Sequence, residues 1–220
     1  MIGIVPAAGY ATRLGRIEGS KEMLDVDGAP VIERLVQRLE VGGCHTIRVV
    51  TRPEKHDIRR YAEARGLEVV LGHPAHLGES IAAGLGRGEI PDEPVAIGFP
   101  DSIWEPPEGI ALIRPLLDAD TDVVLGLFGF PDPSRADVVV VDEEGRVRDI
   151  LVKPDRPPST LIWGVLVARA GALRGAERHP WPSDLLRPLV AAGRVAGRFL
   201  SDSYVDIGTP QALAAARSDE

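Results

Sequence analysis

The sequence predicts an α/β fold with a mostly parallel central sheet, flanked by helices and extended by a small additional hairpin. Three observations support this fold class. A short apolar run opens the chain at residues 2–5, strand-like and helix-like segments then alternate to about residue 130, and strands dominate residues 131–205. Alternating strands and helices are typical of a parallel sheet with right-handed crossovers. At 220 residues one large domain is the economical interpretation, so we expect a single domain over residues 1–220.

The first half of the chain alternates strands with amphipathic helices. Strands are predicted at short runs of apolar and β-branched residues, namely residues 2–5, 46–51, 67–71, 95–101 and 122–128. Helices are predicted where apolar residues recur at helical spacing, namely residues 31–39, 54–65, 79–87 and 110–117. Pro30 suits the first turn of the earliest helix, and Gly42 with Gly43 ends it.

The second half of the chain is richer in strands. They are predicted at residues 138–141, 147–152, 161–167 and 195–200, and the first two form a hairpin around the turn at residues 142–145. We expect this region to add a small sheet that covers the crevice of the main sheet. Helices are predicted at residues 170–176, 183–192 and 210–217. Thr209 is the expected N-cap of the last helix and Pro210 its first residue.

Composition excludes several classes of protein. The hydrophobic content of 44% includes no apolar run near the ~20 residues of a membrane span, and the start lacks the basic segment of a signal peptide. We therefore expect a cytoplasmic protein without a membrane partner. The net charge of −8 argues against nucleic acid as a partner. Cys44 is the single cysteine, which excludes an intramolecular disulfide and a thiolate metal cage. A homo-oligomer stays compatible with the sequence.

The loop after the first strand has the composition of an anion-binding site. Its small residues let the backbone approach a ligand closely, and consecutive N–H groups in a turn favour anions. Arg13 adds a planar fork of donors and Lys21 a compact charge, which suits a polyphosphate. The dinucleotide fingerprint fails because Ala11 and Leu14 stand where glycines are needed, and the Walker spacing fails as well.

Two aspartates and two histidines also lie where strands end. Asp101 ends an apolar strand, so it either faces the crevice or only caps the turn ahead of Ser102. Asp206 lies just before the turn that starts the last helix, and its position alone does not decide whether it has a functional role. His73 and His76 flank Pro74, which forbids the helix that would align them as metal ligands. The loop at residues 72–78 is a candidate lid or base-contacting segment because it follows a strand.

Five separated segments together resemble a known family. Residues 6–14 (PAAGYATRL) resemble the AAGxGTRL signature of the sugar-1-phosphate nucleotidylyltransferases, also called NDP-sugar pyrophosphorylases. SKEML at 20–24, with GAPVI at 28–32, is similar to the lysine motif of that family. Three later segments are similar to further motifs of the family, in the same order along the chain: FPDSI at 99–103, DEEG at 142–145 with VKP at 152–154, and YVDIGTP at 204–210. The resemblance runs from Ile2 to Leu213.

The resemblance implies a Rossmann-like nucleotidyltransferase domain, with a nucleotide-binding half at about residues 1–130 and an acceptor-binding half at about residues 131–205. In this family an oxygen of a sugar phosphate attacks the α-phosphorus of a nucleoside triphosphate, and pyrophosphate leaves. The protein positions the reactants and neutralises their charge. The implied cofactor is Mg²⁺, and the implied partners are a nucleoside triphosphate and a phosphorylated sugar or related metabolite.

The resemblance also implies a role for each charged residue. Arg13 would hold the β- and γ-phosphates, Lys21 the α-phosphate, and Lys153 the sugar phosphate. Asp101 and Asp206 would coordinate Mg²⁺, which prefers a few carboxylates together with substrate phosphates. The residues implied to contact the nucleotide are Ala7, Ala8, Gly9, Tyr10, Ala11, Thr12 and Gly78.

The sequence departs from the family pattern at a few positions. Ala11 replaces the second glycine of the loop, and Ser102 replaces the Asn beside the metal-binding aspartate. Val152 replaces a Glu that contacts the sugar, and the Gly expected before the hairpin strand is Ala136 or Asp137. Because the departures after Ala11 lie on the acceptor side, the identity of the acceptor stays open.

Two alternative functions also stay open. One is transfer of CMP or another nucleotidyl group to a non-sugar phosphate, such as a polyol or choline phosphate. The other is a non-catalytic nucleotide-sensing protein.

Overall fold

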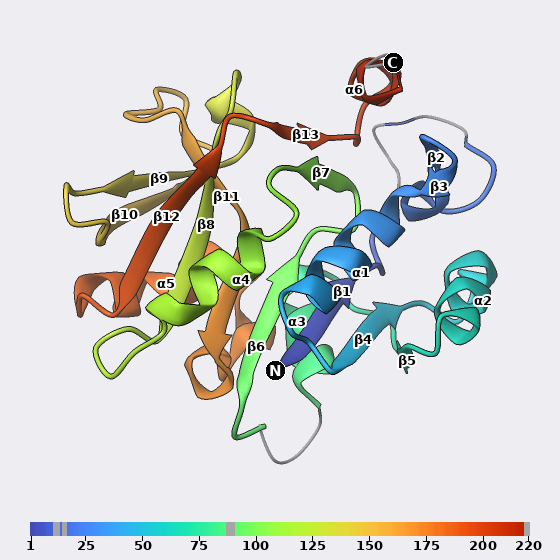
Figure 1. Ribbon diagram of the computed structural model, residues 1–220, viewed down its shortest axis with the longest axis horizontal. Coiled ribbons are helices and arrows are strands. Elements are labelled where there is room, and N and C mark those ends of the chain that lie inside the picture. Colours follow the sequence, from blue (N-terminus) through green and yellow to red (C-terminus); the bar gives the residue numbers. More distant parts are fainter. Residues whose placement is uncertain (11–13, 15–16, 87–90, 218–220) are drawn as a thin grey trace.

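The main sheet runs through both halves of the chain and is covered by helices on its two faces (Figure 1). The structure is a computed structural model that describes residues 1–10, 14, 17–86 and 91–217. In this part of the chain the main sheet has nine strands. They are β1 (Ile2–Pro6), β4 (Thr46–Thr51), β5 (Glu68–Leu71), β6 (Pro94–Gly98), β8 (Val123–Gly129), β9 (Asp137–Val141), β10 (Val147–Val152), β11 (Leu161–Arg169) and β12 (Val195–Ser201).

The pairing of the strands confirms the predicted fold class. β5, β4, β1 and β6 are parallel neighbours, as the alternation of strands and helices predicts. β11 then lies antiparallel between β6 and β8, and β12 pairs with β8 in parallel. The predicted β9–β10 hairpin is present. It joins the main sheet through the pairing of Ile162 in β11 with Val138 in β9, so the expected separate small sheet is instead an extension of the main one.

The helices agree with the prediction in position and differ at some ends. They are α1 (Val31–Val41), α2 (His56–Ala64), α3 (Leu77–Leu85), α4 (Gly109–Ile113), α5 (Pro182–Ala191) and α6 (Pro210–Ala216). Thr209 caps α6 as predicted, because its side chain accepts a hydrogen bond from the N–H of Ala212 at 3.2 Å. The prediction of an α-helix at residues 170–176 is wrong. These residues form short 3-10 turns, and Gly175 between them has a φ of 83°.

Apolar side chains fill both sides of the sheet. Successive residues of a strand point to opposite faces. In β8, Val124 and Phe128 pack into the cluster under α1, α2 and α4, whereas Leu125 and Leu127 pack into the cluster under α3 and α5. This burial on both faces explains why the strands are continuous apolar runs.

A small ribbon that the sequence did not predict brings distant segments together. β7 (Ser102–Trp104) pairs antiparallel with β13 (Tyr204–Asp206), and the register places Asp206 opposite Ser102. Figure 1 shows β13 leading from the end of β12 to α6. A third apolar cluster of Val26, Val31 and Ile207 anchors this ribbon against the start of α1 and the short β2 (Asp25–Val26) and β3 (Ala29–Pro30) pair.

A buried ion pair holds the segment that carries Lys21. The Lys55 ammonium donates to both carboxylate oxygens of Glu22 at 3.0 Å and to the carbonyl of Ala7 at 2.9 Å. Glu22 is 1% exposed and lies in the short 3-10 helix Lys21–Met23. Asp57 binds the same segment, since it accepts hydrogen bonds from the backbone N–H and hydroxyl of Ser20 at 2.7 and 2.8 Å. These contacts fix Lys21 relative to the end of β1.

None of the helices in the described ranges is both long and apolar enough to span a bilayer.

We expect α3 to require a glycine at position 78, because the helix packs closely against neighbouring backbone there. A Cβ at this position of α3 would lie 2.2 Å from the carbonyl oxygen of Ala176 and 2.1 Å from that of His179. We expect Gly78→Ala to lower the free energy of unfolding by about 1–3 kcal/mol, because backbone atoms must move to relieve the overlap. Urea denaturation measures the change. Gly171→Ala is the control, since a Cβ there meets nothing within 4 Å. Equal stability of both variants would contradict the packing role.

Removing one partner of the buried pair of Glu22 and Lys55 should lower the free energy of unfolding more than removing both partners. Lys55→Met leaves the Glu22 charge in the interior, so we expect a loss of about 3–5 kcal/mol in the free energy of unfolding. Burial raises the pKa of Glu22, and the ammonium groups of Lys55 and Lys21 counteract this rise. Without Lys55, the buried Glu22 carboxylate is relieved of its charge when it binds a proton, which happens more readily at pH 5. The loss in the free energy of unfolding should therefore be larger at pH 8 than at pH 5.

The double variant Lys55→Met/Glu22→Met should recover much of this stability, because no buried charge is left without a partner. The exposed pair of Arg34 and Asp27 is the control, and Arg34→Met should cost less than about 1 kcal/mol. A double variant less stable than Lys55→Met would contradict this account.

Candidate functional site

A cavity of about 680 Å³ opens beyond the carboxyl ends of β1 and β6. This is the place where open α/β sheets bind ligands. The loop after β1 and Lys21 line one wall, and the hairpin with the start of α5 lines the opposite wall, because β11 and β6 separate β9 from β1 in the sheet. The segment around Asp101, which follows β6, lines the cavity as well. The lining includes Ala8, Gly9, Tyr10, Lys21, Arg52, Asp101, Asp137, Lys153, Trp163, Trp181 and Asp206.

The predicted ammonium and carboxylates meet on one side of this cavity. Lys21 and Asp101 form an ion pair although 80 residues separate them in the sequence. Burial alone would lower the pKa of Lys21, but the carboxylates of Asp101, Glu22 and Asp206 outweigh burial and raise it. Lys21 therefore carries its charge at neutral pH, as a group that neutralises phosphate must.

The ribbon explains how Asp206 reaches Asp101. Asp101 directly precedes β7, Asp206 ends β13, and the N–H of Ile207 donates to the carbonyl of Asp101 at 3.0 Å. One carboxylate oxygen of Asp206 accepts the N–H of Gly208 at 2.8 Å. Asp206 therefore holds the turn at Gly208 and also has a place beside Asp101.

Two adjacent carboxylates fit a magnesium ion. Mg²⁺ uses one or two carboxylates with substrate phosphates and keeps several waters, so the carboxylates of Asp101 and Asp206 would be enough protein ligands for the predicted ion. No group of three or more His, Cys, Asp or Glu residues within the described ranges is arranged to hold a metal. The predicted cofactor thus depends on these two carboxylates together with bound phosphates.

Lys153 lies on the opposite wall in an unusual backbone conformation. Its φ is 43°, a left-handed value that costs a non-glycine residue about 1–3 kcal/mol. Its ammonium sits 4.0 Å from the ring centroid of Trp181, within the range of a cation–π contact. The left-handed turn ends β10 and leaves Lys153 lining the cavity.

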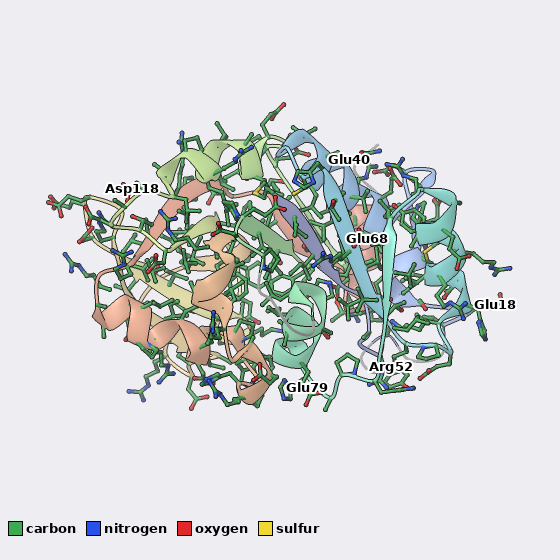
Figure 2. All side chains as sticks on the ribbon, turned by 90° about the horizontal axis from the view of Figure 1, so that it is seen from below. Glu18, Glu40, Arg52, Glu68, Glu79 and Asp118 are labelled. Atoms are coloured by element: carbon green, nitrogen blue, oxygen red, sulfur yellow. The ribbon has the colours of Figure 1, made fainter. Side chains whose placement is uncertain are left out.

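The loop after β1 is held by an arginine that sequence reasoning missed. The Arg52 guanidinium donates to the carbonyls of Ala8 and Pro74, both at 2.8 Å, and lies 4.7 Å from the ring centroid of Tyr10. It connects the loops that follow β1 and β5 at one edge of the molecule (Figure 2). The only sequence signal for this role was its place directly after the strand β4.

The residues predicted to contact the nucleotide are placed differently from one another. Ala8, Gly9 and Tyr10 line the cavity, whereas Ala7 is fully buried. Gly78 is absent from the lining and packs against the carbonyls of Ala176 and His179, so its contact with a nucleotide stays a prediction. The predictions for Ala11, Thr12 and Arg13 fall outside the described residues.

A second group that the sequence did not assign to the site lies beside Lys153. Asp137, the first residue of β9, lines the cavity and accepts a hydrogen bond from the hydroxyl of Ser183. Trp163 donates its indole N–H to the same hydroxyl oxygen at 3.2 Å. The contact joins Asp137 and Ser183, which are 46 positions apart in the chain. The sequence had marked only Asp137, as a candidate departure from the family pattern.

Comparison with known proteins finds relatives named as nucleotidyltransferases. The UTP–glucose-1-phosphate uridylyltransferase AglF of Haloferax volcanii is 26% identical, and the match covers 96% of this chain and 93% of that protein. The low-salt glycan biosynthesis nucleotidyltransferase Agl11 of the same organism is 28% identical over 73% of this chain, and the match spans only 47% of that relative.

A solved structure shows the same fold. It is named as a glucose-1-phosphate thymidylyltransferase from Bacillus anthracis in complex with sucrose, and it superposes with a TM-score of 0.85 at 18% identity. The superposition covers 99% of this chain and 94% of that one. The resemblance drawn from the sequence motifs is therefore confirmed at the level of fold.

Residues 3–194 match the family of MobA-like NTP transferase domains. This match spans most of the chain, and it includes Lys21, Asp101 and Lys153. The chain therefore belongs to this family of nucleotidyltransferases.

Proposed function

We propose that the protein is a Mg²⁺-dependent nucleotidylyltransferase that condenses a nucleoside triphosphate with a sugar 1-phosphate to give an NDP-sugar and pyrophosphate. The observation that carries this proposal is the meeting of Lys21, Asp101 and Asp206 on one side of a cavity whose other side holds Lys153. One cationic group thus lies on each side of a space large enough for two phosphorylated substrates. Family membership and the names of the relatives support the same reaction class.

The nucleotide side of the site neutralises charge. An oxygen of the acceptor phosphate forms a bond to the α-phosphorus while the bond to the pyrophosphate oxygen breaks, so negative charge gathers on the α-phosphate and on the leaving group. The Lys21 ammonium lies in the cavity wall and withdraws this charge from the α-phosphate. A magnesium ion held by Asp101 and Asp206 would add Lewis-acid stabilisation of the phosphate oxygens.

The acceptor side of the site orients the attacking phosphate. Lys153 presents its ammonium from the hairpin, where the left-handed backbone and the face of Trp181 restrict its position. A fixed cation on this side of the cavity would hold the acceptor phosphate near the α-phosphorus, and such positioning supplies much of the rate in a phosphoryl-type transfer.

The contact between Lys153 and Trp181 also favours a sugar phosphate over choline phosphate. A quaternary ammonium is recognised by open aromatic faces. The Lys153 ammonium already lies over a face of Trp181, and like charges repel, so a second cation on that face is disfavoured.

A pyrophosphate-release assay with the four nucleoside triphosphates and a panel of acceptor phosphates tests the function. The panel contains hexose 1-phosphates, a polyol phosphate and choline phosphate. We expect release with at least one hexose 1-phosphate in the presence of Mg²⁺, and loss of release when EDTA removes the ion. Release with choline phosphate or the polyol phosphate alone would replace the proposed acceptor, and no release with any pair would favour a nucleotide-sensing protein.

Asp101→Asn should lower kcat by at least about 100-fold at saturating Mg²⁺, because a neutral amide is a poor ligand for a hard cation. Lys21→Met should lower kcat by about 100- to 1,000-fold, since the charge on the α-phosphate loses its counter-charge. Asp27→Asn is the matched control. Its carboxylate is exposed, and Asn tolerates the φ of 55° at that position. Unchanged turnover in Asp101→Asn would exclude the metal-binding role.

A further inference from the structure

Asp137 is a carboxylate inside the cavity that the proposed reaction does not use. It opens β9 opposite Val152 of β10, and Lys153 follows Val152 directly. The side chain is partly buried and lines the same wall as Lys153 and Trp181. Asp101 and Asp206, by contrast, lie with Lys21 on the side assigned to the triphosphate. Asp137 is therefore an acceptor-side group.

The orientation of Asp137 is fixed by buried donors. One carboxylate oxygen accepts the hydroxyl hydrogen of Ser183, whose oxygen accepts the indole N–H of Trp163. Ser183 is 0% exposed and Trp163 is 5% exposed, so this chain of hydrogen bonds belongs to the interior. A group held in this way is preorganised to recognise a ligand at one position.

The electrostatics show what kind of ligand group the carboxylate needs. Burial raises the pKa of Asp137, and the hydroxyl of Ser183, the ammonium of Lys153 and the indole N–H of Trp163 counteract the rise. A carboxylate has about four acceptor sites, and Ser183 and Trp163 use at most two of them. Lys153 already supplies a positive charge beside it. The complementary ligand group is therefore a neutral hydrogen-bond donor, such as a hydroxyl.

We propose that Asp137 is a specificity-determining residue that accepts a hydrogen bond from a hydroxyl of the acceptor sugar while Lys153 holds the phosphate of the same molecule. This inference rests on the proposed function. Ser183 and Trp163 act through Asp137 as positioning residues. A site built to accept a hydroxyl discriminates against an analogue that lacks it, because the buried acceptor is then left without a donor.

Deoxy analogues of the sugar 1-phosphate test the proposal. Kinetics are measured with the most active sugar 1-phosphate of the assay and with analogues deoxygenated at one ring position at a time. We expect one analogue to lower kcat/KM of the wild-type protein by about 10- to 100-fold, as expected for a lost hydrogen bond to a charged group. Asp137→Ala should lower kcat/KM for the parent sugar 1-phosphate by a similar factor. Its kcat/KM for that analogue should be less than about threefold below its own value for the parent.

Three controls separate recognition of the sugar from damage to the fold. Asp184→Asn removes a neighbouring carboxylate on α5 that does not line the cavity, so discrimination should stay at the wild-type level. The KM for the nucleoside triphosphate should not change in Asp137→Ala, because the triphosphate lies on the opposite side. Asp137→Asn, which keeps the size of the side chain, should discriminate at a level between the wild type and Asp137→Ala.

The outcomes distinguish this proposal from the proposed function. If sugar 1-phosphates are substrates and Asp137→Ala discriminates among deoxy analogues as the wild type does, Asp137 does not recognise the sugar, although the reaction stands. If no deoxy analogue affects the wild type, the proposal is equally excluded. If no sugar 1-phosphate releases pyrophosphate, the proposed function itself fails and the role of Asp137 fails with it.

Discussion

The buried ion pair between Glu22 and Lys55 is the constraint on which the site depends. An ammonium group in the interior requires acceptors for its protons, and here they are the Glu22 carboxylate and the carbonyl of Ala7. Ala7 follows β1, Glu22 lies in the 3-10 helix and Lys55 precedes α2, so one side chain joins three segments. Lys21 is the neighbour of Glu22, and its position is therefore determined by interior contacts.

The second constraint is the ribbon of β7 and β13. It ties the end of the chain to the segment that leaves β6, and its register places Asp206 beside the residues that follow Asp101. Two carboxylates close together repel one another unless cations lie between or beside them. Lys21 supplies that positive charge in the structure, and the fit of the pair to Mg²⁺ follows from the same need.

Each side of the cavity combines an ammonium group with at least one carboxylate, but the proposed ligands of the two sides differ. In the proposed function, the ammonium of Lys21 and the carboxylates of Asp101 and Asp206 would match a charged triphosphate with its metal. Lys153 and Asp137 would match a molecule that is anionic at one end and neutral at the other. A protein with a net charge of −8 would then concentrate cations where phosphates bind, and would use a carboxylate where the ligand offers hydrogen-bond donors.

The sequence by itself determined the order of the nine main-sheet strands and of the helices α1 to α6, because periodicity, turn residues and caps such as Thr209 act over a few positions. It also pointed to Lys21, Asp101, Lys153 and Asp206 through their motifs. Only the tertiary structure decided which distant residues meet. The pairing of β7 with β13, the joining of the hairpin to β11, and the contact between Asp137 and Ser183 depend on strand register and on packing between segments. Gly78 shows the same limit, since its contacts with the carbonyls of Ala176 and His179 arise from a segment about 100 residues away, which no local pattern contains.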